Sequence, residues 1–327
     1  MALNFPKLHM LFLSLLVIVN PFLFVEPIAL EPTTHPFTKT LQTLEGVHKG
    51  QTVKGVAELK TYLRKFGYLK NDNNNSPNDH FDEYVESALK NYQTYHNLPI
   101  TGKVDAITIE RMSLPRCGVP DINIITHGSP NGLVILANYS FFPGSPKWDN
   151  TKRALTYAYV SSANVALSMD DVRVAVQSAF KSWSQVTDFT FTEIGTESGP
   201  VDIVVGFHSG DHGDGYPFDG PGQVLAHAFA PQDGRLHYDA EEQWTTSPTG
   251  QNGGLEKNGW FGRRRRRPRK PVSIDLQSVA LHEIGHLIGL GHSSVLGSIM
   301  FPAYGGVRRD LTQDDVDGIH ALYKSTN

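Results

Sequence analysis

A histidine-rich segment near the C-terminal end carries the clearest chemical pattern in the chain. Residues 282–292 read HEIGHLIGLGH. On a helix, His282 and His286 project about 40° apart from one face and can bind the same metal ion. Gly289 permits a sharp turn that returns His292 to that ion as a third nitrogen ligand. Three histidines that leave one position for water are typical of a catalytic zinc site.

Glu283 follows the first of these histidines and can reach a metal-bound water without being a ligand, which suits the general base of a hydrolase. Zinc lowers the pKa of such a water to roughly 7 and polarises a scissile carbonyl. The alternative, histidines that merely face the polar side of a helix, requires three histidines, a glutamate and a glycine to coincide at fixed offsets. We therefore predict a zinc-dependent hydrolase.

A methionine follows closely in the segment 298–302, SIMFP. The histidine pattern with a later methionine turn is the signature of the metzincin peptidases. Met300 would then form a hydrophobic floor beneath the metal, although ordinary core packing is the alternative for any single methionine.

A second set of metal-binding residue types lies between residues 206 and 244, a stretch rich in glycine, aspartate and histidine. Because this stretch has few apolar residues to bury, bound ions are a plausible source of its order. Three histidines and an aspartate complete four zinc ligands with no open position, as in a structural site. These residues are His212, Asp214, His227 and His237. We interpret His208 as a non-ligand.

The same stretch offers oxygen donors of the kind that calcium prefers. Asp219 lies in the segment 218–222, FDGPG, which combines a carboxylate with a bent backbone. Asp239 and Glu242 can supply further carboxylates. The alternative is a polar loop in which acids and histidines are merely scattered.

The chain has one cysteine, Cys117, within the segment 115–121, PRCGVPD. In an exported protein a single thiol can dimerise, be a buried bystander or act as a ligand. As a thiolate it could occupy the fourth position of the catalytic zinc and silence the enzyme. Arg116 and Asp121 can pair with each other to fix this segment, and Gly118 lets its backbone approach the cleft.

The elements around these residues indicate two folded units. After a Pro- and Thr-rich stretch at 31–38, interpreted as a flexible joint, apolar residues recur at helical spacing in 53–66 and 84–95, and Asp105 can cap a third short helix. A Gly- and Pro-rich connector at 115–146 precedes a region of strands and helices. There we expect strands at 155–160, 189–194 and 202–207 and helices at 169–183 and 313–323. The fold class is α+β, with a mixed sheet packed on helices.

The N-terminus indicates the compartment. Lys7 and His9 precede an apolar run at 10–19, as in a secretory signal peptide; a membrane anchor is the alternative, but Asn20 and Pro21 interrupt the run too early. With 327 residues, 39% hydrophobic and 19% charged, the chain is an ordinary globular protein with room for two domains. Its net charge of −4 identifies no partner.

The cysteine segment, the histidine and aspartate cluster and the HEIGHLIGLGH segment, in this order, resemble the matrix metalloproteinases (matrixins) from about Leu44 to Tyr323. The resemblance implies a metzincin catalytic domain, with a twisted mixed five-stranded sheet and three helices, after a three-helix peptidoglycan-binding-like propeptide. It implies that Glu283 is the catalytic base and that Cys117 binds the catalytic zinc in a latent form. The implied ligands are His282, His286 and His292 for catalytic zinc, His212, Asp214, His227 and His237 for structural zinc, and Asp219, Gly220, Gly222, Val224 (through its carbonyl), Asp239 and Glu242 for calcium.

The implied organisation is a signal peptide at 1–30, a propeptide at 31–146 and a catalytic domain at 147–327. The propeptide would comprise the helical domain at about 44–114 and the cysteine switch at 115–121, and activation would cut between Asp121 and about Trp148. We expect a secreted monomer that cleaves extracellular proteins, with its own propeptide as inhibitor and no nucleic-acid partner. The short C-terminal end resembles plant matrixins without a haemopexin domain, and a lipid anchor is the less favoured alternative.

An Arg-rich stretch within an insertion at 249–271 departs from the family pattern. It is interpreted as a solvated insertion or a gene-model error, while binding to acidic polymers or cleavage by a basic-residue protease are alternatives. Asn74 and Asn138 fit glycosylation acceptors. The rival function is a polysaccharide-binding module on a catalytically dead metal scaffold, which would not need Glu283.

Overall fold

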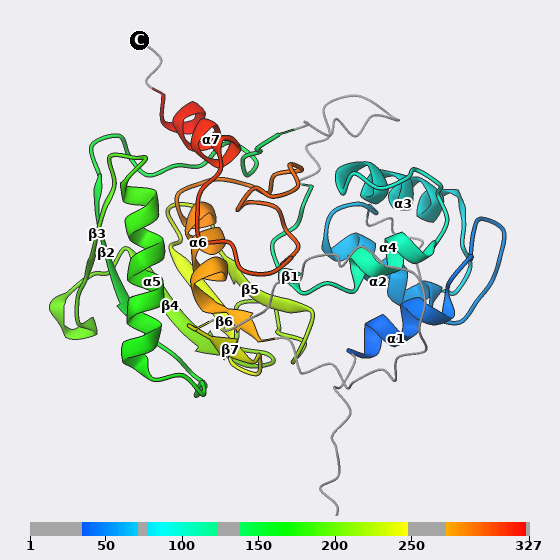
Figure 1. Ribbon diagram of the computed structural model, residues 1–327, viewed down its shortest axis with the longest axis horizontal. Coiled ribbons are helices and arrows are strands. Elements are labelled where there is room, and N and C mark those ends of the chain that lie inside the picture. Colours follow the sequence, from blue (N-terminus) through cyan, green and yellow to red (C-terminus); the bar gives the residue numbers. More distant parts are fainter. Residues whose placement is uncertain (1–34, 71–77, 123–137, 248–272, 325–327) are drawn as a thin grey trace, which may run out of the picture.

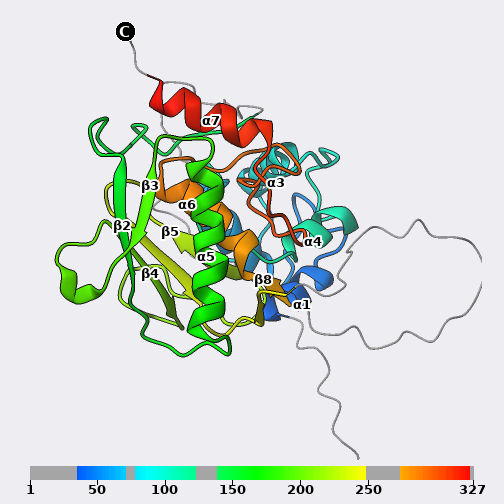
Figure 2. The same ribbon diagram turned by 60° about the vertical axis from the view of Figure 1, so that its left-hand side comes forward.

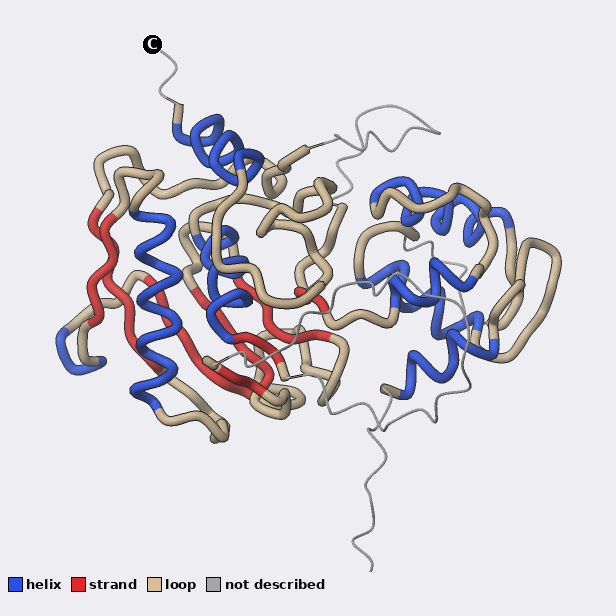
Figure 3. The backbone as a smooth tube through the Cα atoms, in the orientation of Figure 1, coloured by secondary structure: helices blue, strands red, loops and turns tan. Residues whose placement is uncertain are grey.

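The computed structural model describes residues 35–70, 78–122, 138–247 and 273–324. They form a helical body and a larger body built on a sheet, joined by the segment that contains β1 (Figures 1 and 3). The expected signal peptide, Asn74 and the insertion at 249–271 lie outside the described residues.

The helical body contains the three predicted helices, α2 (Val56–Lys65), α3 (Glu83–Tyr95) and α4 (Ala106–Met112). Asp82 and Asp105 cap the last two because their carboxylates accept backbone N–H groups of the first turn.

A fourth helix, α1 (Pro36–Thr43), was not predicted. The interpretation of residues 31–38 as a flexible joint was wrong from Pro36 onward, because proline at the first helical turn favours a helix start. Leu41, inside this helix, and Leu44, just after it, are fully buried in the core of the helical body. The body therefore begins before Leu44.

The larger body is built on a six-stranded mixed sheet in the order β1-β5-β6-β4-β2-β3. Neighbouring strands are parallel except for the antiparallel pair β5 and β6. The strands are β1 (Arg116–Cys117), β2 (Ala154–Tyr159), β3 (Thr190–Glu193), β4 (Ile203–His208), β5 (Val224–Ala228) and β6 (Arg235–Asp239), with a separate small pair β7 (Trp244–Thr245) and β8 (Ile274–Asp275).

The α+β prediction is confirmed, and so are the strands expected at 155–160, 189–194 and 202–207, within one residue at each end. The five strands β2 to β6 make the expected five-stranded sheet. The sixth, β1, comes from the cysteine segment and extends the sheet at the β5 edge. The sequence did not predict β6, because its alternate residues Arg235, His237 and Asp239 are polar although the strand lies inside the sheet.

Three helices belong to this body: α5 (Met169–Ser184), α6 (Leu276–Leu287) and α7 (Gln313–Tyr323). Figures 1 and 2 show α5 and α6 side by side over the sheet, and the indole of Trp183 on α5 donates to the carbonyl of Leu281 on α6 at 2.8 Å. A short 3-10 helix, η1 (Thr196–Ser198), follows β3. No helix among the described ranges is both long and apolar enough to cross a membrane.

Candidate active site and metal centres

Helix α6 and the turn behind it position three histidines around one point. His282 and His286 lie one turn apart on α6, and Gly289, with φ +107°, reverses the chain so that His292 returns to them. The Nε2 atoms of His282 and His292 are 3.2 Å apart. The Sγ atom of Cys117 lies 3.5 Å from Nε2 of His286. The ligand atoms of these four buried residues all lie within 4.8 Å of one another.

Hydrogen bonds to backbone carbonyls fix the tautomers of two of the three rings. Nδ1 of His282 contacts the Ile299 carbonyl at 2.6 Å, and Nδ1 of His286 contacts the Leu290 carbonyl at 2.7 Å. Because carbonyl oxygens only accept, each Nδ1 carries the proton and each Nε2 presents a lone pair. Burial lowers the pKa of His282 to about 3, helped by the neighbouring His292, so this ring is neutral.

Neutral rings whose lone pairs face each other at such short distances repel unless a cation lies between them. Histidine nitrogens are ligands that zinc prefers, and here three of them lie together in a buried group. The residues present therefore fit a zinc ion.

Glu283 is fully buried beside this group. Neither of its carboxylate oxygens has a hydrogen-bond partner of normal geometry. Burial raises the pKa of Glu283 to about 8, although the nearby Cys117 thiol lowers it in part. Burying a carboxylate without hydrogen-bond partners lowers the stability of the fold. Such unpaired groups are usually found where the side chain must act on a water or a ligand.

The segment around Cys117 lies between the sheet edge and the chain that follows the methionine turn. On one side Arg116 N donates to the Gln223 carbonyl at 2.7 Å, and Gly118 N donates to the Ala226 carbonyl at 2.8 Å. On the other side Cys117 N donates to the Pro302 carbonyl at 3.0 Å. Burial raises the pKa of the Cys117 thiol well above its ordinary value, and the charge of Glu283 raises it further. A thiolate is therefore stable here only beside a cation.

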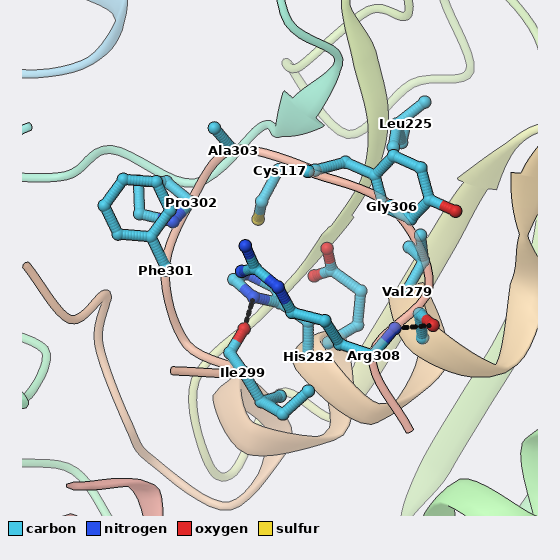
Figure 4. Close-up of a pocket in the computed structure, with 14 residues that line it drawn as sticks. Cys117, Leu225, Val279, His282, Ile299, Phe301, Pro302, Ala303, Gly306 and Arg308 are labelled. Atoms are coloured by element: carbon cyan, nitrogen blue, oxygen red, sulfur yellow. Dashed lines mark hydrogen bonds between the residues drawn. The ribbon is translucent and has the colours of Figure 1, made fainter. Parts of the chain in front are cut away.

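A small pocket opens next to Glu283, with the sulfur of Cys117 directed into it (Figure 4). Its volume is about 40 Å³, enough for a few water molecules and too small for a large side chain. Leu225, Val279 and Ile299 supply apolar walls and Arg308 lies across it. The chain between Ile299 and Arg308, at and after the methionine turn, supplies much of the remaining lining.

Met300 is fully buried beneath α6. A Cβ atom at Gly285 would collide with the Met300 sulfur, so the glycine inside the HEIGH segment lets the methionine approach the helix. The sequence alone did not point to this role of Gly285.

Asp315, a buried residue in the first turn of α7, is a further residue that the sequence did not point to. Its carboxylate accepts hydrogen bonds from Ile299 N at 3.0 Å, Met300 N at 3.0 Å and the Ser298 hydroxyl at 2.5 Å. Asp315 therefore fixes the methionine turn, including the residue whose carbonyl orients His282. The only signal in the sequence is an aspartate three residues after Thr312, which by itself indicates a capping box.

The second predicted group also comes together. One oxygen of Asp214, Oδ2, lies 2.9 Å from His212 Nε2, 2.7 Å from His227 Nε2 and 2.9 Å from His237 Nδ1. Burial lowers the pKa of His227 and that of His237 to about 4. Both rings are therefore neutral and able to bind a metal ion. These four residues form the second group whose ligand atoms lie within 4.8 Å of one another.

His208, interpreted above as a non-ligand, lies outside this group. Its Nδ1 is 2.7 Å from the Ser162 hydroxyl, and its ring packs against the ring of His237.

The expected calcium residues are arranged more loosely. Within the described ranges, only the two histidine-containing groups bring at least three His, Cys, Asp or Glu ligand atoms within 4.8 Å. Asp219 Oδ1 accepts from Val224 N at 3.1 Å, and Glu242 Oε1 accepts from Gly222 N at 2.6 Å. The bent backbone is present, since Gly220 and Gly222 have φ values of +78° and +107°.

The acids of this loop nevertheless favour a cation. The Oδ2 atom of Asp239 is buried without a hydrogen-bond partner. Burial and neighbouring carboxylates raise the pKa of Asp239 to about 6 and that of Glu242 to about 7. A bound cation would relieve this repulsion.

Comparison with known proteins identifies the family. Residues 147–324 match the matrixin family (Peptidase_M10), and residues 52–112 match a peptidoglycan binding domain. The chain is 43% identical to Metalloendoproteinase 5-MMP of Arabidopsis thaliana, over 91% of this chain and 79% of that protein. It is 42% identical to Metalloendoproteinase 1 of Glycine max, over 84% of each chain. With Interstitial collagenase of Sus scrofa it shares 36% identity, over 81% of this chain and 48% of that protein. The chain therefore belongs to the matrixin family of zinc-dependent metalloendopeptidases.

Proposed function

We propose that this matrixin is a secreted, zinc- and calcium-dependent endopeptidase of extracellular proteins, made as a zymogen that its own propeptide silences. The observation that carries the catalytic part is the juxtaposition of three converging histidine nitrogens with a buried carboxylate that lacks partners. A zinc ion bound by His282, His286 and His292 would polarise the scissile carbonyl and make a water molecule more acidic. Glu283 accepts a proton from the attacking water and delivers it to the leaving amine.

For latency, we assign Cys117 as the fourth donor. Its thiol lies 3.5 Å from His286, and β1 pairs with the β5 edge that the backbone of a bound peptide could otherwise use. The family match that begins at residue 147 supports a propeptide at 31–146, with the switch at 115–121, and a catalytic domain at 147–327. Cleavage between Asp121 and about Trp148 would then release Cys117 from the site.

We assign the remaining ions to structural roles. The group of His212, Asp214, His227 and His237 would hold a second zinc ion with no open position. The carboxylates of Asp219, Asp239 and Glu242, with backbone oxygens near Gly220, Gly222 and Val224, would hold calcium.

Export as a monomer to the extracellular space is part of the same proposal. It rests on the expected signal peptide at 1–30 and on the names of the relatives, among them an interstitial collagenase.

Replacing the proposed base tests the catalytic mechanism. In the processed enzyme, Glu283→Gln is expected to lower kcat for a quenched peptide by about 10²- to 10⁴-fold, the usual contribution of general acid–base catalysis, while zinc content stays unchanged. Glu197→Gln, at an exposed glutamate in η1, is the matched control and should leave kcat unchanged. Full activity of Glu283→Gln would refute the mechanism. A parent enzyme that binds zinc and polysaccharide but cleaves no peptide would favour the binding module.

A further inference from the structure

The three histidines of the active site are oriented from different parts of the molecule. The Nδ1 atoms of His282 and His286 donate to backbone carbonyls of the sheet-containing body itself. Nδ1 of His292 instead lies 2.9 Å from Oδ1 of Asp121, in the cysteine segment. One ring of the zinc site is therefore oriented by a carboxylate that activation removes.

The helical body holds this carboxylate firmly. The Asp121 side chain is completely buried and forms an ion pair with Arg116. The Tyr68 hydroxyl donates to its Oδ2 at 2.6 Å, and Nε2 of His96 lies 3.5 Å from the same oxygen. Because this carboxylate pairs with a buried guanidinium and accepts from the Tyr68 hydroxyl, the group that faces His292 is a fixed anion.

A fixed anion at Nδ1 changes the opposite nitrogen of the ring. It keeps the proton on Nδ1, so that Nε2 has its lone pair directed at His282 Nε2, 3.2 Å away. It also makes the imidazole a stronger donor than a neutral carbonyl would. Outer partners of this kind typically change metal affinity by about 10- to 100-fold.

We propose that Asp121 is a positioning residue for the zinc site, so that the propeptide acts on this site twice: Cys117 contacts the metal and Asp121 orients His292. The proposal rests on the assignment of zinc to the three histidines. Its consequence is that the latent chain holds zinc more tightly than the processed enzyme, even without the thiol.

The simpler interpretation is that Asp121 only neutralises Arg116. That guanidinium is buried, lies 3.4 Å over the Phe66 ring and donates from Nε to the Cys117 carbonyl at 3.1 Å, so it needs a counter-ion. The two interpretations differ in which neighbour of Asp121 matters. If Asp121 is only a counter-ion, its loss affects Arg116. If it is a positioning residue, its loss affects His292.

The test compares zinc affinities in the full-length chain with Cys117→Ser and Glu283→Gln, which remove the thiol and prevent self-cleavage and leave Asp121 in place. Zinc is titrated against a competing chelator, and the group of His212, Asp214, His227 and His237 supplies the same second binding phase in every variant. Adding Arg116→Gln should lower the melting temperature and leave the affinity of the three-histidine site unchanged. Adding Asp121→Asn to the chain that already carries Arg116→Gln should lower the zinc affinity of the three-histidine site by about 10- to 100-fold. Because the buried arginine is already gone, the last step leaves no unpaired cation.

Two further measurements separate a positioning role from a structural one. With cobalt in place of zinc, the visible absorption bands of the three-histidine site should change with Asp121→Asn and keep their shape with Arg116→Gln. Asp105→Asn, a neutralised helix cap, should change neither affinity nor spectrum.

Equal affinities and spectra with and without the Asp121 carboxylate would overturn the proposal, as would an equal loss on Arg116→Gln alone. Failure of the proposed function has a different signature. In that case the Cys117→Ser chain would bind the same amount of zinc after His282→Ala as before.

Discussion

The two groups of metal-binding residues differ in where their members come from. His212, Asp214, His227 and His237 all belong to the sheet-containing body, and a single aspartate oxygen contacts all three histidines. The active-site group takes its fourth donor, Cys117, from a segment 169 positions before His286, and Glu283 beside it has no hydrogen-bond partner of normal geometry. The first arrangement is complete within one body, whereas in the proposed zymogen the second opens when the other body leaves.

Removal of the thiol should have the largest effect on this contrast. With Cys117→Ser, the full-length chain is expected to cleave a quenched peptide faster than the parent precursor and to process itself early, because no sulfur donor closes the site, although β1 still covers the β5 edge. Initial rates and gel analysis at time zero separate the two effects. Ser113→Ala, which removes a hydroxyl near the end of α4, is the control. Parent and Cys117→Ser precursors that stay equally silent would contradict the switch.

Loss of a histidine should mainly lower the stability of the protein in one group and mainly abolish its activity in the other. His237→Ala is expected to lower the free energy of unfolding by about 3–4 kcal/mol, the stabilisation lost when an ion at 100 to 1,000 times its Kd no longer binds. His292→Ala in the processed enzyme should abolish cleavage with a smaller loss of stability. Urea unfolding and peptide cleavage on both variants test the pattern. Equal losses of stability and of activity in the two variants would mean that the two sites do not divide into a structural and a catalytic one.

The support beneath the active site can be weakened without touching a ligand. Asp315→Asn should cost about 1.5–3 kcal/mol, the contribution of hydrogen bonds to a charged acceptor, because the amide replaces a carboxylate that binds Ile299 N and Met300 N. Activity should fall with it, since the Ile299 carbonyl orients His282. Asp317→Asn on the exposed side of α7 is the control. A stable but inactive variant would assign Asp315 a direct chemical role.

The smallest effect concerns the contact between the helical body and the expected calcium loop. Lys65 Nζ lies 3.8 Å from Asp219 Oδ2, and both side chains are partly exposed. Lys65→Ala should weaken docking by at most about 1 kcal/mol, so a thiol reagent should label Cys117 up to about fivefold faster. Lys39→Ala serves as the control, at an exposed lysine of α1. Much faster labelling would show that this loop is the main anchor of the propeptide.

Most of the elements near the site could be predicted because their signals are local. Gly289 has the positive φ that the turn requires, and the cap at Asp105 lies where its helix starts. Strand β6 and helix α1 could not be predicted in this way. His237 and Asp239 of β6 are buried only because the rest of the body covers them, and α1 is stabilised by leucines that pack against distant helices.

The sequence by itself determined the chemistry: three histidines and a glutamate at helical spacing, a lone cysteine, and a second set of histidines with an aspartate. The spacing of His282, Glu283 and His286 lies along one helix, which fixes their distances whatever the rest of the chain does. Only the tertiary structure decided that Cys117 enters as an added strand, that Asp121 contacts His292 and that Asp315 fixes the methionine turn. Contacts between residues so far apart depend on how whole bodies pack, and no local pattern records that packing.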